Sequence, residues 1–121
     1  MSYQKLRVYQ AAVELRAEVD KLRKVLIRKP EFLSLFAHVD DAVDSIQNNI
    51  AEGSSSVYPG KQAKFFDIAL GSADEVRSGL RSLSERGAFG STKTYRATAL
   101  AFTIAKMLWR MINHARSLQS K

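Results

Sequence analysis

The segments Ser45–Gly53, SIQNNIAEG, and Ile68–Glu75, IALGSADE, decide the fold of this chain. An apolar stripe with spacings of four, three and four residues ends in Ile46 and Ile50. Small and polar residues run beside that stripe, about 100° further round the helix: Ala42, Ser45, Asn49 and Glu52. A face that points to solvent does not require an amide and a carboxylate next to the core at helical spacing. We therefore predict a second interface on this helix, either inside a helix bundle or between subunits.

Proline and glycine divide the chain into four segments, and each segment carries apolar residues at heptad spacing. The predicted helices span 3–28, 34–52, 61–86 and 93–118. No stretch of useful length alternates in the manner of a strand. The pattern predicts one all-α domain over residues 1–121, an antiparallel up-down-up-down four-helix bundle. We expect its core to include Ile46, Ile50, Ile68, Val76, Leu108 and Ile112.

Three glycines have predicted structural roles. Gly53 is expected to end the second helix in the left-handed conformation that glycine adopts without strain, and residues 54–60 are expected to form a loop. Gly71 and Gly79 lie inside the third predicted helix, where each costs about 1 kcal/mol relative to alanine. Both are therefore predicted to let a neighbouring helix approach closely.

The carboxylates Glu52 and Glu75 lie on adjacent predicted helices, which raises the question of catalysis or metal binding. Metal sites in helix bundles use Glu-x-x-His pairs, and neither His38 nor His114 has that spacing. The chain has no cysteine, which excludes disulfides and thiolate metal sites. We expect no enzyme activity, no metal and no cofactor, and we expect both carboxylates to accept hydrogen bonds within the bundle. The predicted structural set is Ser45, Asn49, Glu52, Gly53, Gly71, Ser72 and Glu75.

The positive charge of the chain is concentrated near its C-terminus. The net charge is +7, yet residues 1–85 hold equal numbers of acids and bases, and residues 86–121 hold no acid. In an antiparallel bundle, the end of the first helix meets the end of the third and the start of the fourth. The cations gathered there form a predicted basic pole: Lys21, Arg23, Lys24, Arg28, Lys29, Arg81, Arg86, Lys93 and Arg96. Such a patch favours salt-dependent, sequence-independent binding of phosphates, and the alternative is a solvated surface that only aids solubility.

The last predicted helix carries two apolar stripes displaced by one residue. Their combined width exceeds what one core face needs, and an exposed apolar patch of this kind usually marks an interface. We therefore predict more than a monomer, with an oligomer interface that includes Phe102, Met107, Trp109 and Met111.

The pattern S-I-x-x-N-I-A-E-G at 45–53, followed by I-A-x-G-S-x-x-E at 68–75, resembles a known family. It is the bacterial four-helix-bundle family encoded in intervening sequences of large-subunit rRNA genes, which is related to accessory proteins of diversity-generating retroelements. The resemblance implies a four-helix bundle that assembles into a ring-like homopentamer.

Two hypotheses of function remain open. In the first, the protein is a non-enzymatic, oligomeric accessory protein that binds RNA or DNA phosphates through the basic pole. In the second, it is a structural or adaptor oligomer that binds a protein partner such as a reverse transcriptase. A membrane-surface role ranks last, because the apolar stripes serve packing, and we expect no membrane association. The N-terminal stretch MSYQKLRVYQ has no apolar signal-like region, so a cytoplasmic bacterial protein is expected.

Overall fold

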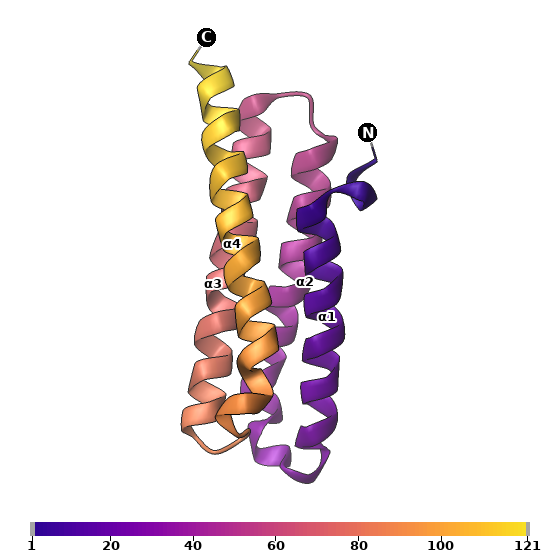
Figure 1. The fold of residues 1–121 in the computed structure, drawn as a ribbon, viewed down its shortest axis with the longest axis vertical. Helices are drawn as coiled ribbons and strands as arrows, with labels where there is room; N and C mark the ends of the chain where they lie inside the picture. Colours follow the sequence, from indigo (N-terminus) through magenta and orange to yellow (C-terminus); the bar gives the residue numbers. More distant parts are fainter. Residues whose placement is uncertain (1, 121) are drawn as a thin grey trace.

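The computed structural model describes residues 2–120, and four long α-helices account for most of them (Figure 1). They are α1 (Arg7–Val25), α2 (Leu33–Ser55), α3 (Pro59–Glu85) and α4 (Ser91–Gln119). Successive helices run in opposite directions, and each helix packs against two neighbours. Both α1 and α3 contact α2 and α4, so α1 and α3 lie diagonally across the bundle from each other. Residues 2–120 contain no strand. The predicted all-α up-down-up-down bundle is confirmed.

The core is built from one inward stripe on each helix. Five of the six predicted core residues are buried: Ile46, Ile50, Val76, Leu108 and Ile112. The sixth prediction is wrong, because the side chain of Ile68 is 43% exposed. The neighbouring Ala69 takes the inward position in that turn of α3, which places Ile68 about 100° away from the core.

The structure corrects the predicted ends of the helices. Leu6 is extended, with φ −69° and ψ 137°, so α1 begins after it, and a short 3-10 turn at Leu26–Arg28 ends it. A second 3-10 turn, Pro30–Phe32, leads into α2. At the start of α3, Pro59 occupies a first-turn position, where its missing N–H group is not needed. The loop predicted over residues 54–60 is therefore reduced to the three residues between α2 and α3.

Gly53 does not end α2, which continues to Ser55. Its prediction as a left-handed terminal residue is wrong, because Gly53 is buried inside the helix. A Cβ atom at this position would lie 2.7 Å from Cε1 of Phe66 on α3. The absence of a side chain therefore allows α2 and α3 to approach, and no left-handed turn is involved.

The two glycines predicted to allow close packing on α3 behave differently. A Cβ atom on Gly79 would lie 2.7 Å from Cγ2 of Val39, so the prediction of close helix approach is confirmed there. A Cβ atom on Gly71 would meet no atom of the described residues within 4 Å, so the prediction is wrong there for packing between residues 2 and 120.

The turn between α3 and α4 closes one end of the bundle. Gly87 has φ 87° and lies just beyond the end of α3. Its N–H donates to the carbonyl of Ser84 at 3.1 Å, while the N–H of Ala88 donates to the carbonyl of Leu83 at 2.9 Å. This pair of bonds is a Schellman motif, in which the buried side chains of Ala88 and Leu83 come together.

Candidate nucleic-acid interface

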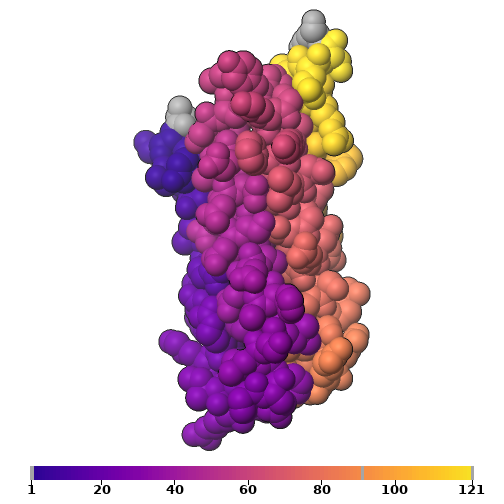
Figure 2. All heavy atoms as spheres, turned by 180° about the vertical axis from the view of Figure 1, so that it is seen from behind, coloured from indigo at the N-terminus to yellow at the C-terminus, as the bar shows by residue number. Residues whose placement is uncertain are grey.

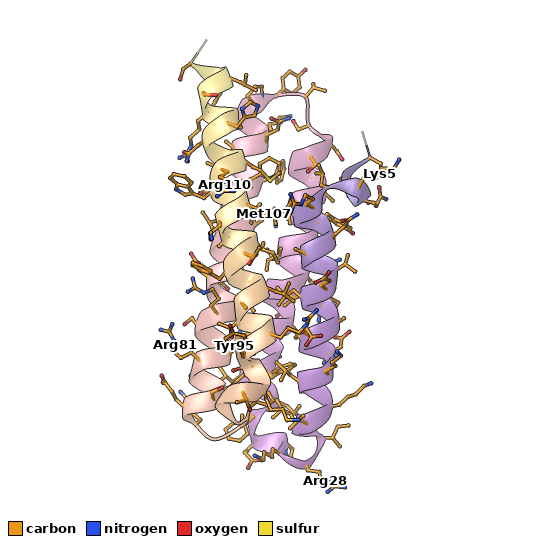
Figure 3. All side chains as sticks on the ribbon, in the orientation of Figure 1. Lys5, Arg28, Arg81, Tyr95, Met107 and Arg110 are labelled. Atoms are coloured by element: carbon orange, nitrogen blue, oxygen red, sulfur yellow. The ribbon has the colours of Figure 1, made fainter. Side chains whose placement is uncertain are left out.

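The nine cations of the predicted basic pole lie on the segments that form the lower end of the bundle (Figure 3). These segments are the end of α1 with its 3-10 turn, the end of α3 and the start of α4. Figure 3 shows Arg28 at the tip of this end and Arg81 higher on α3. The topology therefore brings the nine residues to one end of the molecule, but their side chains have different surroundings.

Three of the nine cations form ion pairs with acids of the same chain. Lys21 Nζ lies 2.8 Å from Oε2 of Glu18 on α1, and Nε of Arg96 lies 3.5 Å from the same oxygen. Arg23 pairs with Asp20 at 3.0 Å and also with Asp40 on α2. These pairs reduce the charge that the three side chains can offer to a phosphate.

Lys29 has a structural role in the described chain. Its Nζ donates to the carbonyl of Gly87 at 3.0 Å and lies 3.4 Å from the carbonyl of Ala88. These carbonyls belong to the Schellman turn after α3, so Lys29 ties the α1–α2 connection to the α3–α4 turn. The sequence distance of 58 residues explains why the pattern alone did not reveal this contact.

The residue that organises the ion pairs between α1 and α2 is Arg16, which the sequence analysis missed. Its Nη1 donates to Oδ1 of Asp40 at 2.8 Å, and its Nη2 donates to Oδ1 of Asp44 at 2.6 Å. Burial lowers the pKa of Arg16, but the hydrogen bonds to these aspartates outweigh burial and leave its pKa above the ordinary value. The hydrogen bond to Asp40 likewise raises the pKa of Arg23. Both guanidinium groups therefore stay charged and hold α1 against α2.

The remaining five cations are exposed, and within residues 2–120 none of their charged groups has a hydrogen-bond or ion-pair partner: Lys24, Arg28, Arg81, Arg86 and Lys93. Several of them lie near the C-terminal ends of α1 and α3, where the helix dipole favours a cation. Glu31 and Glu85 at the same end are also exposed and dilute the positive charge. These five cations are the part of the predicted pole that remains available to an anionic ligand.

Aromatic side chains form an exposed row along α4. Tyr95, Phe102 and Trp109 recur every seven residues, and their side chains are 74%, 47% and 61% exposed. Cζ of Arg77 on α3 lies 4.8 Å from the centroid of the Phe102 ring, and Nζ of Lys106 lies 5.3 Å from it. We call this surface the aromatic face: Arg77 and Arg81 of α3 with Tyr95, Phe102, Lys106 and Trp109 of α4. Tyr95 lies seven residues before Phe102, and this spacing is the sequence signal that would have placed Tyr95 in the predicted interface.

The two methionines of the predicted interface lie elsewhere. Met107 and Met111 are half-buried and line a cavity of about 570 Å³ between α4 and the start of α1. Figure 3 shows Met107 and Arg110 on α4 beside the segment where the chain enters α1. The cavity exists because α1 begins at Arg7 while α4 continues far beyond that level. We call it the basic groove: Lys5, Leu6, Arg7, Met107, Arg110 and Met111.

The predicted structural set also divides into two groups. Oγ of Ser72 on α3 donates to Oγ of Ser45 on α2 at 2.7 Å and so links the two helices, while Nδ2 of Asn49 donates to the carbonyl of Ser45 at 2.8 Å within α2. Glu52 and Glu75 are exposed, and within residues 2–120 neither has a partner. The expected hydrogen bonds to these carboxylates are therefore not present, because both side chains are exposed to solvent.

Two further findings bear on the class of protein. Among residues 2–120, no group of three or more His, Cys, Asp or Glu side chains is placed to hold a metal ion. In the same part of the chain, no helix combines the length and the apolar character that crossing a membrane requires.

Comparison with known proteins gives one match. The family model described as 23S rRNA-intervening sequence protein matches residues 4–110, which include α1, α2, α3 and most of α4. No curated protein and no solved structure matches the chain. Because the family model covers most of the sequence, this chain belongs to the family of 23S rRNA-intervening sequence proteins.

Proposed function

We propose that this protein is a non-enzymatic, homo-oligomeric accessory protein that binds RNA or DNA phosphates through the basic pole. The observation that carries the proposal is the set of five exposed cations at one end of the bundle, which have no acid partner within residues 2–120. Membership of a family described by an rRNA intervening sequence supports a nucleic-acid context. A cytoplasmic location and a ring of several copies, a pentamer by resemblance, are parts of the same proposal.

The expected binding mode follows from the chemistry of these side chains. Each Lys or Arg that neutralises a phosphate releases condensed counterions, so affinity falls as salt concentration rises. The pole offers flexible cations on helix ends and no element shaped to enter a groove, so contacts to the backbone dominate and the binding tolerates changes of sequence. A cyclic oligomer repeats the pole around one rim, which multiplies weak contacts through avidity.

A salt-titrated binding assay with single-stranded RNA, double-stranded RNA and double-stranded DNA tests the proposal. We expect the triple variant Lys24→Glu, Arg28→Glu, Lys93→Glu to lose at least about tenfold in affinity, with a smaller salt slope, because each lost phosphate contact lowers that slope by about 1. The matched control is Lys5→Glu, Arg7→Glu, Arg110→Glu, which makes the same change of charge at the other end of the bundle. Equal losses in both variants, or no binding by the wild type at low salt, would overturn the proposal.

The basic groove supports a second candidate function, that of an adaptor for a protein partner. Its floor is formed by Leu6, Met107 and Met111, and Lys5, Arg7 and Arg110 surround it without any acid among the lining residues. An apolar floor with methionines and a cationic rim suits an amphipathic helix that carries acidic residues at its edges. Such a helix, for example from a reverse transcriptase, is the partner that this candidate requires.

A fluorescently labelled acidic amphipathic peptide is the probe for the adaptor function. We expect saturable binding that Leu6→Glu together with Met111→Glu abolishes, while nucleic-acid affinity stays within about threefold because the pole is unchanged. An affinity for the peptide that does not respond to the double substitution would refute the groove as its site.

A further inference from the structure

A hollow of about 510 Å³ lies on the outer side of the seam between α2 and α3. Figure 2 views the molecule from this side, with α2 in the middle and α3 beside it. We call the surface around the hollow the acidic face: His38, Asp41, Asp67, Ile68, Gly71 and Glu75. Within residues 2–120, its three carboxylates have no hydrogen-bond or ion-pair partner. The acidic face therefore combines uncompensated negative charge with a recess.

The identities of two residues of the acidic face are not explained by the packing between residues 2 and 120. Ile68 is 43% exposed although it is a large apolar side chain. Gly71 lies in the middle of α3, where alanine would favour the helix, and no atom within 4 Å of its added Cβ requires a glycine. An exposed isoleucine beside an unexplained glycine indicates a position that another molecule covers.

The aromatic face has the complementary properties. Trp109 is 61% exposed and supplies a large apolar side chain. Lys106 and Arg81 are exposed cations, and the nearby Asp74 pairs with Arg77 at 3.7 Å, which leaves the face positive overall. The aromatic face thus projects apolar rings with positive charge, and the acidic face provides a recess with negative charge.

Trp109 and Gly71 also lie at about the same height on the bundle. Arg77 and Phe102 mark one level, since Cζ of Arg77 is 4.8 Å from the centroid of the Phe102 ring. The helices α3 and α4 are antiparallel. Position 109 is seven residues after Phe102 on α4, and position 70 is seven residues before Arg77 on α3. Both positions therefore lie roughly 10 Å from the Arg77–Phe102 level, in the same direction along the bundle axis. Trp109 is therefore level with Leu70, next to Gly71. A second copy with a parallel axis presents its indole to the recess at Gly71.

We infer that copies of this chain associate head to tail, with the aromatic face of one copy on the acidic face of the next and Trp109 over Gly71. The inference rests on the proposed function for the homo-oligomer and names its interface. A two-fold dimer through either face would place like charges against each other, which disfavours it. Opposite charges meet only when unlike faces pair.

The positions of the two faces determine how such an assembly ends. Both faces include α3 and lie on adjacent sides of the bundle, about 90° apart in a square arrangement. Repeating one head-to-tail contact between such faces turns each copy relative to the last, so the series of contacts closes into a ring. Parallel axes also place every basic pole on the same rim of that ring.

Two substitutions break one face each. Gly71→Arg fills the recess and reverses the charge of the acidic face, while the open space around Gly71 lets the chain fold. Trp109→Glu removes the indole and places an acid on the aromatic face. Ala17→Arg is the matched control, because it adds the same side chain at an exposed position of α1, away from both faces. Light scattering at micromolar concentration gives the mass of each variant, and circular dichroism shows whether it is folded.

We expect the wild type and the Ala17→Arg variant to be oligomers, and each of the other two variants to be a folded 13.5 kDa monomer. Mixing Gly71→Arg with Trp109→Glu restores one contact, because each chain keeps one intact face, and a species of two chains should form only in the mixture. A mixture that stays monomeric, or variants that remain oligomers alone, would overturn the interface while leaving the proposed oligomer standing. A monomeric wild type would overturn both, and the salt-titrated assay would still report on the basic pole.

Discussion

The seam between α2 and α3 is closed at two places and open between them, although glycine occurs at all three. At one closed place Phe66 packs on Gly53, and at the other Val39 packs on Gly79, each within 2.7 Å of the position that a Cβ would take. At Gly71 no atom of the described chain lies within 4 Å of that position. The difference teaches that a glycine inside a helix is explained by the residue that packs against it, and Gly71 has no such neighbour among residues 2–120.

The largest contrast is expected between two isoleucines of this seam. Ile50 is fully buried and Ile68 is 43% exposed. Ile50→Ala should lower the free energy of unfolding by about 2–5 kcal/mol, because it leaves a cavity in the core. Ile68→Ala should change it by no more than about 0.5 kcal/mol, as exposed substitutions do. Urea unfolding in the Trp109→Glu background, which removes the proposed assembly, measures both, and similar losses would contradict the assignment of the two faces.

The next effect is expected at the closed end of the seam. Gly53→Ala should destabilise the fold by about 1–2 kcal/mol, because the overpacking of Phe66 outweighs the gain in helix propensity. The Phe66 ring is buried, so moving it aside would disturb its packing in the core. Thermal unfolding in the same background measures the change. A stabilised variant would show that the ring adapts and that the seam is less tight than the structure indicates.

A smaller loss is expected at the middle of the seam. Ser72→Ala removes the hydrogen bond of 2.7 Å to Ser45 and should cost about 1 kcal/mol, since Ser72 is buried and the hydroxyl of Ser45 loses this donor. Ser78→Ala on the exposed side of α3 is the matched control and should be nearly neutral. Equal effects of the two substitutions would mean that the bond between the serines contributes nothing.

The smallest effect is expected at the open position, and its sign is opposite. Gly71→Ala should stabilise the monomeric background by about 0.5–1 kcal/mol, because alanine favours the helix and its Cβ meets no atom. Chemical denaturation of this variant beside Gly53→Ala compares the open and closed positions directly. A loss of stability at residue 71 would remove the contrast on which the proposed interface depends.

The residues whose roles were predicted correctly are those that depend on helical periodicity. Ile46 and Ile50 were assigned to the core from spacing alone, and both are buried. The wrong prediction for Ile68 also comes from reliance on periodicity. Ile68 and Ala69 are adjacent and both apolar, and the spacing of apolar residues does not show that the smaller Ala69 faces the core. The close packing at Gly53 was missed because it depends on Phe66, which belongs to another helix.

The basic pole shows a similar division. The order and directions of the helices predict which segments meet at one end of the bundle, but they do not predict whether the cations on those segments are available. Lys29 binds carbonyls of the α3–α4 turn, and Arg23 pairs with Asp40 on α2. Neither contact leaves a signal in the spacing of residues along one helix. The sequence therefore predicts nine cations at the pole, whereas the structure leaves the charged groups of five without a partner in residues 2–120.

By itself, the sequence determined the helices and the bundle, because these depend on a local period and on chain order. Only the tertiary structure decided which cations are free, which glycines are needed within the chain and which faces of α3 and α4 stay uncovered. The physical reason is that burial and ion pairing depend on the groups that a neighbouring helix presents across the seam. Those groups are far away in the sequence, as Gly53 and Phe66 show.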